Sequence, residues 1–220
     1  MKKQRLTYAL LLTILVAAVM VVLSGFLSHW NWAVTGTAAL IGLAVILCGA
    51  APMKQYGTKM LVTLGMLVAI EIVLSRFCSI SAWNIKIGFS FAPVVVAAVL
   101  YGAIPAAVVA ALGDFMGAIL FPIGPYFPGF TLTAALTGTV FGLFLHKRQT
   151  VGRIGGAVAV NQLVLSLLLN TVWISVLYGA PYGPLFLTRI VQTVVLIPVQ
   201  FVVIGVMTKV LGGYGKRAVL

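Results

Sequence analysis

The sequence predicts an all-α integral membrane protein, and three observations support this fold class. Of the 220 residues, 62% are hydrophobic and only 7% are charged, whereas charged residues make up about a quarter of soluble domains. The apolar residues form runs of about 20 residues, which as helices would cross a bilayer core. Most basic residues stand between these runs or near their ends, where they set topology. The net charge of +12 therefore indicates membrane insertion rather than a nucleic-acid partner.

The expected order of elements follows from eight apolar runs. The fourth run is short and contains Pro93, which interrupts helical hydrogen bonding, so this span would be tilted, begin earlier near Ile85, or cross incompletely. The runs are Leu6–Leu27, Ala33–Ala51, Lys59–Phe77, Phe89–Tyr101, Ala103–Phe121, Phe130–Leu145, Ile154–Tyr178 and Leu185–Leu211. We therefore expect two helices in residues 1–56, followed by a core of six helices in residues 57–220.

The positions of Lys and Arg predict the orientation of the spans. If the spans alternate in direction, eleven of the fourteen basic residues fall on one side, which the positive-inside rule makes cytoplasmic. A multi-pass protein of the cell membrane with both termini in the cytoplasm is expected. The first run also resembles a secretory signal, but its apolar stretch is longer than a usual signal core, which favours an uncleaved span.

The three basic residues that break this pattern are candidates for ligand binding. Arg76, Lys86 and Arg189 fall at the outer side, where they could contact lipid headgroups or bind an anionic solute that arrives from outside. The only two carboxylates, Glu71 and Asp114, fall in the outer half of the membrane. They could form internal ion pairs, Glu71 with Arg189 or Asp114 with Arg76, or could bind a ligand.

A loop rich in proline, glycine and aromatic residues follows Asp114 at the outer side. Residues 122–129 contain three prolines and two glycines, so they cannot be helical, and they should line a cavity or the aqueous boundary. An aspartate can accept hydrogen bonds from two adjacent N–H groups of a flat ring. The candidate stacking residues are Phe121, Tyr126, Phe127 and Phe130, and Asn170 and Trp173 share a helix face nearby.

The motifs that the sequence lacks favour binding without chemistry. There is no phosphate-binding Gly-x-x-x-x-Gly-Lys-Ser/Thr, His-Glu-x-x-His or Gly-x-Ser-x-Gly motif, so we expect neither an enzyme nor an ATPase. Cys48 and Cys78 have no metal-binding spacing and no cofactor is expected.

Five segments resemble the folate-specific S component of energy-coupling factor (ECF) transporters, over about residues 59–211. They are Leu74-Ser-Arg-Phe77, Ile85-Lys-Ile-Gly-Phe-Ser-Phe91, Ala111-Leu-Gly-Asp-Phe-Met-Gly-Ala118, Phe121-Pro-Ile-Gly-Pro-Tyr-Phe-Pro-Gly-Phe-Thr-Leu-Thr133 and Leu168-Leu-Asn-Thr-Val-Trp173. The segment that begins at Phe121 is the most specific. The first 55 or so residues lie outside this resemblance.

The resemblance implies a six-helix protein that captures a vitamin at the outer side and associates with a transmembrane coupling protein and two ATPases. It implies that Gly65 and Ala69 dock the coupling protein, with glycine in place of the usual alanine. The loop from Ser79 to Gly88, which contains Trp83, would close over the substrate. Folate fits the residues, because it joins a flat pterin to an anionic glutamate that Arg76 and Arg189 could bind.

Two alternatives remain open from the sequence. Another vitamin, such as thiamine, could be the ligand, although a cation would sit poorly beside three outer basic residues. A self-sufficient secondary transporter or channel would need its own coupling ions or pore, and Glu71 and Asp114 could relay protons. Such transporters often have two corresponding interrupted helices, whereas this sequence has one interrupted region.

Overall fold

The structure is a computed structural model that describes residues 57–82 and 85–217, so the first two predicted spans lie outside the described residues. Five helical segments of the described chain are long and apolar enough to cross a membrane. The helical elements are α3 (Thr58–Arg76), α4 (Phe91–Tyr101), α5 (Ala103–Leu120), α6 (Pro128–Leu145), α7 (Val151–Ala159), the π-helix η1 (Val160–Leu169), α8 (Asn170–Tyr178) and α9 (Tyr182–Arg217).

The six runs predicted within the described residues correspond to helical segments with bounds that differ by a few residues. The fourth is short, as the sequence indicated, because α4 has only 11 residues. The seventh is one continuous helical segment of 28 residues that passes through α7, η1 and α8. The π-helical stretch in its middle was not predicted.

The all-α prediction needs one correction, because a short β-hairpin follows α3. Strands β1 (Ile80–Ala82) and β2 (Ile85–Ile87) pair antiparallel, with Ile80 opposite Ile87. The β-branched residues and the alternation Ile-Lys-Ile in β2 favour a strand. The segment predicted as a loop from Ser79 to Gly88 therefore contains regular backbone pairing.

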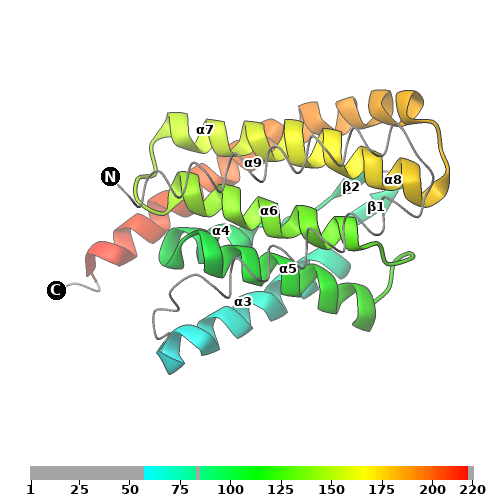
Figure 1. The fold of residues 1–220 in the computed structure, drawn as a ribbon. Coiled ribbons are helices and arrows are strands. Elements are labelled where there is room, and N and C mark those ends of the chain that lie inside the picture. Colours follow the sequence, from blue (N-terminus) through cyan, green and yellow to red (C-terminus); the bar gives the residue numbers. More distant parts are fainter. Residues whose placement is uncertain (1–56, 83–84, 218–220) are drawn as a thin grey trace, which may run out of the picture.

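The helices lie side by side along one direction, which gives the bundle two distinct ends (Figure 1). We call the end that carries β1 and β2 the hairpin end. It also carries the loop between α5 and α6 and the loop between α8 and α9 (Figure 1). The start of α3, the loop between α6 and α7, and the end of α9 lie at the opposite end (Figure 1).

Helices α5 and α6 pack so closely that two glycines of α6 have no room for a side chain. A Cβ added at Gly138 would lie 2.3 Å from the carbonyl oxygen of Ala106, and one added at Gly142 would lie 2.2 Å from the Cα of Ala103. Small residues allow such close approach of helix backbones in membranes. The motif from Gly138 to Gly142 is therefore an internal packing seam.

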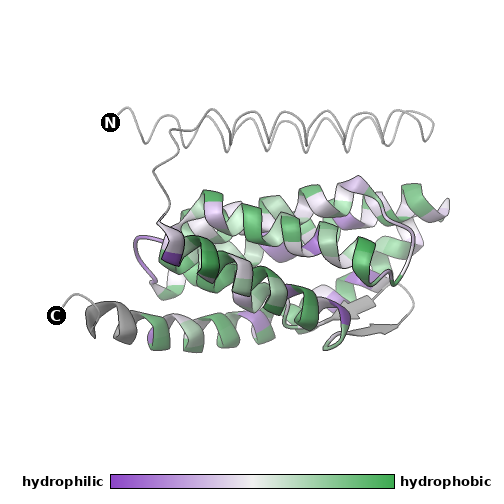
Figure 2. Cartoon of the chain, turned by 90° about the horizontal axis from the view of Figure 1, so that it is seen from below, coloured by the Kyte–Doolittle hydropathy of each residue, from purple (hydrophilic) through white to green (hydrophobic). Residues whose placement is uncertain are grey.

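The outer surface of the bundle is apolar, whereas several polar side chains are buried inside. Green, hydrophobic residues recur along the helices drawn in Figure 2. Leu61, Val62 and Leu187 are among the exposed large hydrophobic residues, while Asn161, Gln162 and other polar groups are buried. This pattern fits a lipid-facing exterior around a polar interior, since buried polar groups at membrane depth usually have a partner or a function.

Candidate ligand-binding site

A cavity of about 480 Å³ opens among the helices towards the hairpin end. This volume lies within the range of pockets that bind small molecules. Its walls come from α3, α4, α5, α6, η1, α8 and α9, together with residues 123–127 of the loop between α5 and α6. Because nearly every helix of the described core contributes, the position of each lining side chain depends on the packing of the whole bundle.

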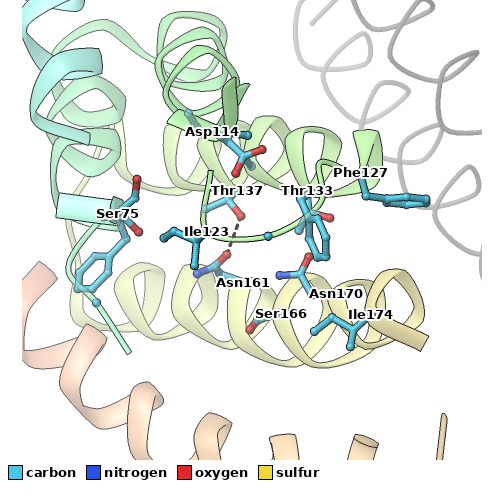
Figure 3. A pocket seen from close by; sticks show the side chains of 18 of the residues that line it. Ser75, Asp114, Ile123, Phe127, Thr133, Thr137, Asn161, Ser166, Asn170 and Ile174 are labelled. Carbon is cyan, nitrogen blue, oxygen red and sulfur yellow. Dashed lines mark hydrogen bonds between the residues drawn. The ribbon is translucent and has the colours of Figure 1, made fainter. Parts of the chain in front are cut away.

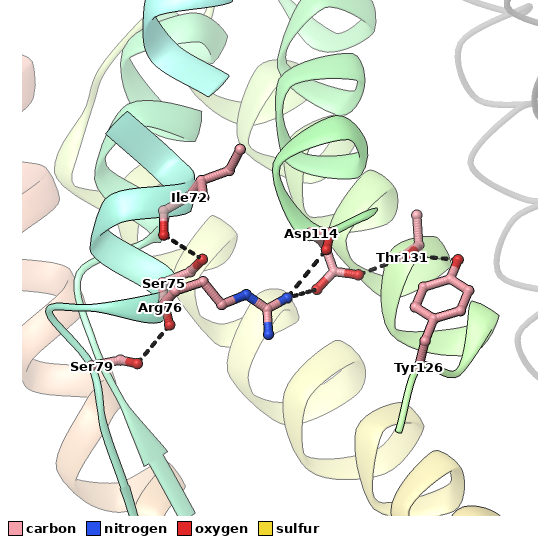
Figure 4. Close-up of polar contacts among 7 residues, drawn as sticks. All are labelled: Ile72, Ser75, Arg76, Ser79, Asp114, Tyr126 and Thr131. Carbon is pink, nitrogen blue, oxygen red and sulfur yellow. Dashed lines mark hydrogen bonds and ion pairs between the residues drawn. The ribbon is translucent and has the colours of Figure 1, made fainter. Parts of the chain in front are cut away.

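We call the part of the cavity at the hairpin end its mouth. A chain of polar contacts there joins α3 to α6 (Figure 4). Arg76 Nη2 lies 3.8 Å from Asp114 Oδ1 and donates a hydrogen bond to the backbone carbonyl of Asp114 at 3.2 Å. Thr131 donates to Asp114 Oδ2 at 2.8 Å, and the hydroxyls of Thr131 and Tyr126 are 3.1 Å apart. The predicted ion pair of Arg76 and Asp114 is therefore present. It joins α3 to α5, and Thr131 and Tyr126 extend the contacts to α6 and to the loop between α5 and α6.

Two glycines of α5 leave the space that the charged side chains of α3 occupy. A Cβ at Gly113 would lie 1.8 Å from Glu71 Oε2, and a Cβ at Gly117 would lie 2.8 Å from Arg76 Nε. The motif from Gly113 to Gly117 thus accommodates side chains of α3, whereas the glycines of α6 accommodate the backbone of α5. Sequence spacing alone could not distinguish these two uses of a small-residue motif.

The aromatic residues of the loop do not form one continuous stacking surface. Phe127 and Phe130 line the cavity and contact each other edge to face, with ring centroids 6.1 Å apart. Phe127 also packs against Trp173 at 5.6 Å. Phe121 lies outside the cavity lining and packs against Phe77 at 5.0 Å.

Trp173 supports the cavity wall from behind. Its side chain is fully buried, and its indole N–H donates to Thr133 Oγ1 at 3.0 Å. A Cβ at Gly129 would lie 2.6 Å from atoms of both Phe127 and Trp173, so the glycine after Pro128 makes this packing possible. Trp173, which the sequence suggested as a substrate-binding residue, is therefore outside the cavity lining and holds Phe127 in place.

The deep end of the cavity has a floor of uncharged polar side chains that the sequence prediction missed. Thr137 of α6 donates to Asn161 Oδ1 at 2.9 Å, and Asn161 Nδ2 donates to Gln200 Oε1 of α9 at 3.2 Å (the Thr137 to Asn161 bond is drawn in Figure 3). These residues form no recognisable motif in the sequence. They become a network only when three helices meet, and no sequence spacing indicates that meeting.

The π-helix presents polar residues to the cavity along much of its length. Asn161, Gln162 and Ser166 of η1 line the cavity, and Asn170 follows at the first residue of α8. Figure 3 shows Asn161, Ser166 and Asn170 on the same helical segment beside the cavity. A π-helix bonds residue i to i+5, and such stretches occur frequently at functional sites. Its wider turn keeps residues four or five apart on one side of the helix.

Arg189 is a buried cation in the cavity wall. It is 6% exposed, and its Nη2 donates to the backbone carbonyl of Ser166 at 3.2 Å. This hydrogen bond joins α9 to η1 nearer the hairpin end than the floor network, because Ser166 follows Asn161 in η1. A guanidinium group in a cavity wall is suited to bind a carboxylate.

The predicted site residues divide into four groups. The cavity brings together Arg76, Asp114, Tyr126, Phe127, Phe130, Asn170 and Arg189. The structure sets Phe121 and Trp173 apart from the cavity lining. Trp83 lies outside the described residues. Gly65 and Ala69, predicted to dock a partner, are exposed on α3, and a Cβ at Gly65 would meet nothing within 4 Å.

The chain matches a protein family and two curated proteins. The family described as "ECF transporter, substrate-specific component" matches residues 59–208. The folate transporter FolT of Clostridium novyi (strain NT) is 36% identical over 147 residues, which cover 66% of this chain and 86% of that protein. The folate transporter FolT of Leuconostoc mesenteroides subsp. mesenteroides is 29% identical over 150 residues, which cover 65% and 80%.

Two solved structures have a similar fold. A crystal structure of FolT bound with folic acid has a TM-score of 0.65 and 32% identity, and the match covers 67% of this chain and 91% of that chain. The S component of a bacterial ECF transporter has a TM-score of 0.53 at 24% identity, covering 73% and 97%, and supports the fold alone.

Proposed function

Because the chain belongs to the substrate-specific components of ECF transporters, we propose that it is a membrane-embedded subunit that binds folate. The observation that supports this most strongly is the cavity itself. It combines aromatic side chains, two arginines and buried amides in a volume of about 480 Å³. The similarity to a FolT structure that holds folic acid makes folate the first ligand to test.

The chemistry of the cavity matches the chemistry of folate. The glutamate of folate carries two carboxylates, and the guanidinium groups of Arg76 and Arg189, both in the cavity lining, are suited to bind them. The flat pterin and aminobenzoyl rings can pack against Phe127 and Phe130. The charges of the two arginines are balanced by Glu71 and Asp114, which also line the cavity. The preference for folate over a cationic vitamin such as thiamine therefore rests on the guanidinium donors, the aromatic rings and the similarity to FolT.

We further propose that the hairpin end faces the outside and that both termini are cytoplasmic. The supporting feature is the charge distribution among the described helices. Lys59, Lys147, Arg148, Arg153 and Lys209 all belong to segments at the end opposite the hairpin (Figure 1). Under the positive-inside rule that end is cytoplasmic, so the cavity would open outwards to capture folate. Residues 1–56 would add two further spans before this core.

Delivery into the cell would depend on partner proteins. The sequence has no phosphate-binding loop, so ATP hydrolysis would come from two ATPase subunits joined through a transmembrane coupling protein. The exposed strip of α3 that contains Gly65 and Ala69 is suited to close helix packing with that coupling protein. A secondary transporter remains the second candidate, because Glu71 and Asp114 both line the cavity.

An uptake experiment in vesicles distinguishes the two candidates. The purified chain alone, in vesicles with an imposed pH gradient, should bind radiolabelled folic acid without accumulating it. Addition of a coupling protein, two ATPase subunits and ATP should give accumulation. Uptake driven by the pH gradient alone would instead support the secondary transporter.

A further inference from the structure

The cavity contains a buried amide that the proposed contacts of folate leave unused. Gln162 of η1 lines the cavity and is only 2% exposed. Within residues 57–82 and 85–217, the structure provides no hydrogen-bond partner for Gln162 Oε1. Its neighbour Asn161 differs, because that side chain is held by Thr137 and Gln200.

An unsatisfied amide at this depth is costly for the unliganded protein. A buried acceptor without a partner costs about 1–3 kcal/mol. A ligand that supplied the missing hydrogen bond would recover that free energy, so the amide would contribute to affinity. The amide also selects among ligands by their hydrogen-bonding groups, because a ligand without a matching donor would leave the amide oxygen unsatisfied.

The level of Gln162 in the cavity indicates which part of a ligand would meet it. It directly follows Asn161 in η1, and Asn161 belongs to the uncharged floor with Thr137 and Gln200. The ion pair of Arg76 with Asp114 lies at the mouth, at the other end of the cavity. An anionic tail belongs with the cations, whereas a neutral heterocycle belongs with the amides.

A carboxamide is complementary to the edge of an oxidised pterin. The pterin of folic acid presents an N3–H donor beside a C4 carbonyl acceptor, and a carboxamide offers an acceptor beside a donor. Two parallel hydrogen bonds can therefore form between them. Asp114 is less suited to this task, because its Oδ2 accepts from Thr131 and its Oδ1 lies beside Arg76.

We propose that the Gln162 carboxamide reads the N3–H and C4 carbonyl edge of a pterin ring at the deep end of the cavity, and is a specificity-determining residue. This inference rests on the proposed function. In this arrangement η1 recognises the pterin ring, and the arginines nearer the mouth bind the glutamate tail of folate.

The test compares folic acid with aminopterin, its 4-amino analogue, in titrations of the purified full-length chain. Aminopterin has an amino donor in place of the C4 carbonyl and a more basic ring, whereas its tail is unchanged. Gln162→Met, which cannot form either hydrogen bond, should weaken folic acid binding at least tenfold. Gln162→Glu should raise the preference for aminopterin over folic acid at least tenfold relative to wild type, because a carboxylate accepts a hydrogen bond from the 4-amino group and attracts a ring that protonates more readily, whereas the C4 carbonyl of folic acid repels it.

Gln149 offers a matched control, because it lies outside the cavity lining and its amide donates to the Leu145 carbonyl. Gln149→Met and Gln149→Glu should leave both affinities unchanged. If wild type binds folic acid but Gln162→Glu keeps the wild-type preference between the two ligands, the role of Gln162 is refuted while the proposed function stands. If wild type does not bind folic acid, the proposed function fails, and the inference fails with it.

Discussion

Gly117→Ala should weaken folic acid binding without altering any charge. The glycine faces Arg76, and a Cβ at this position would lie 2.8 Å from Nε and 3.4 Å from Nη2. The guanidinium would have to move by roughly 0.6 Å, which is the difference between 2.8 Å and the 3.4 Å at which ordinary contact begins. Such a shift would disturb the hydrogen bond of Arg76 to the Asp114 carbonyl and any bond to a ligand carboxylate.

The size of the effect follows from the bond that is disturbed. Hydrogen bonds to charged groups contribute about 1.5–3 kcal/mol. Since about 1.4 kcal/mol corresponds to a tenfold change in Kd, loss of one such bond should weaken folic acid binding about tenfold or more. The charge of the protein and the composition of the cavity wall are otherwise unchanged.

Isothermal titration calorimetry of the detergent-purified protein would measure this effect. Gly205→Ala is a matched control, because this glycine also lies in a helix and a Cβ there would meet nothing within 4 Å. The control should bind folic acid as wild type does. A Kd for Gly117→Ala equal to those of wild type and Gly205→Ala would refute the placement of Arg76 in the folate site.

Three further predictions concern the mouth, the helix seam and the partner surface. Arg76→Ala and Asp114→Ala should each weaken folic acid binding more than tenfold, about 1.4 kcal/mol, and unchanged affinity in both would contradict the site. Gly138→Ala should destabilise the protein by about 1–3 kcal/mol, because its Cβ would meet the α5 backbone; a thermal melt like that of wild type would argue against the close seam. Gly65→Leu should keep wild-type folic acid binding and lose ATP-driven uptake, because the glycine is exposed on α3; retained uptake would show that the coupling protein docks elsewhere.

The sequence was informative where a single residue carried an unusual property. Arg76 stood out as one of three basic residues on the predicted outer side, and Asp114 stood out as one of two carboxylates. The structure brings both to the cavity mouth at 3.8 Å. Hydrophobic runs of membrane length gave the helical segments within a few residues, because lipid imposes both composition and length on a span.

The sequence was less informative where function depends on which side of an element faces inwards. Phe121 and Trp173 share the aromatic character of Phe127, yet one packs on Phe77 and the other is buried behind the wall. Gln162 was missed because it and Asn161 are two polar residues in a long apolar run without a recognisable motif. Its position depends on a π-helix that changes the facing of later residues, and neither hydropathy nor helical spacing predicts that change.

The most direct test of a folate-capture subunit is a titration of the purified chain alone with folic acid, followed by tryptophan fluorescence, with thiamine and riboflavin as comparators. Trp173 makes this readout suitable, because it packs against Phe127 of the cavity wall. We expect saturable quenching by folic acid at submicromolar concentration and no saturation by either comparator. Saturation by a comparator with no response to folic acid would contradict the assignment of folate as the ligand.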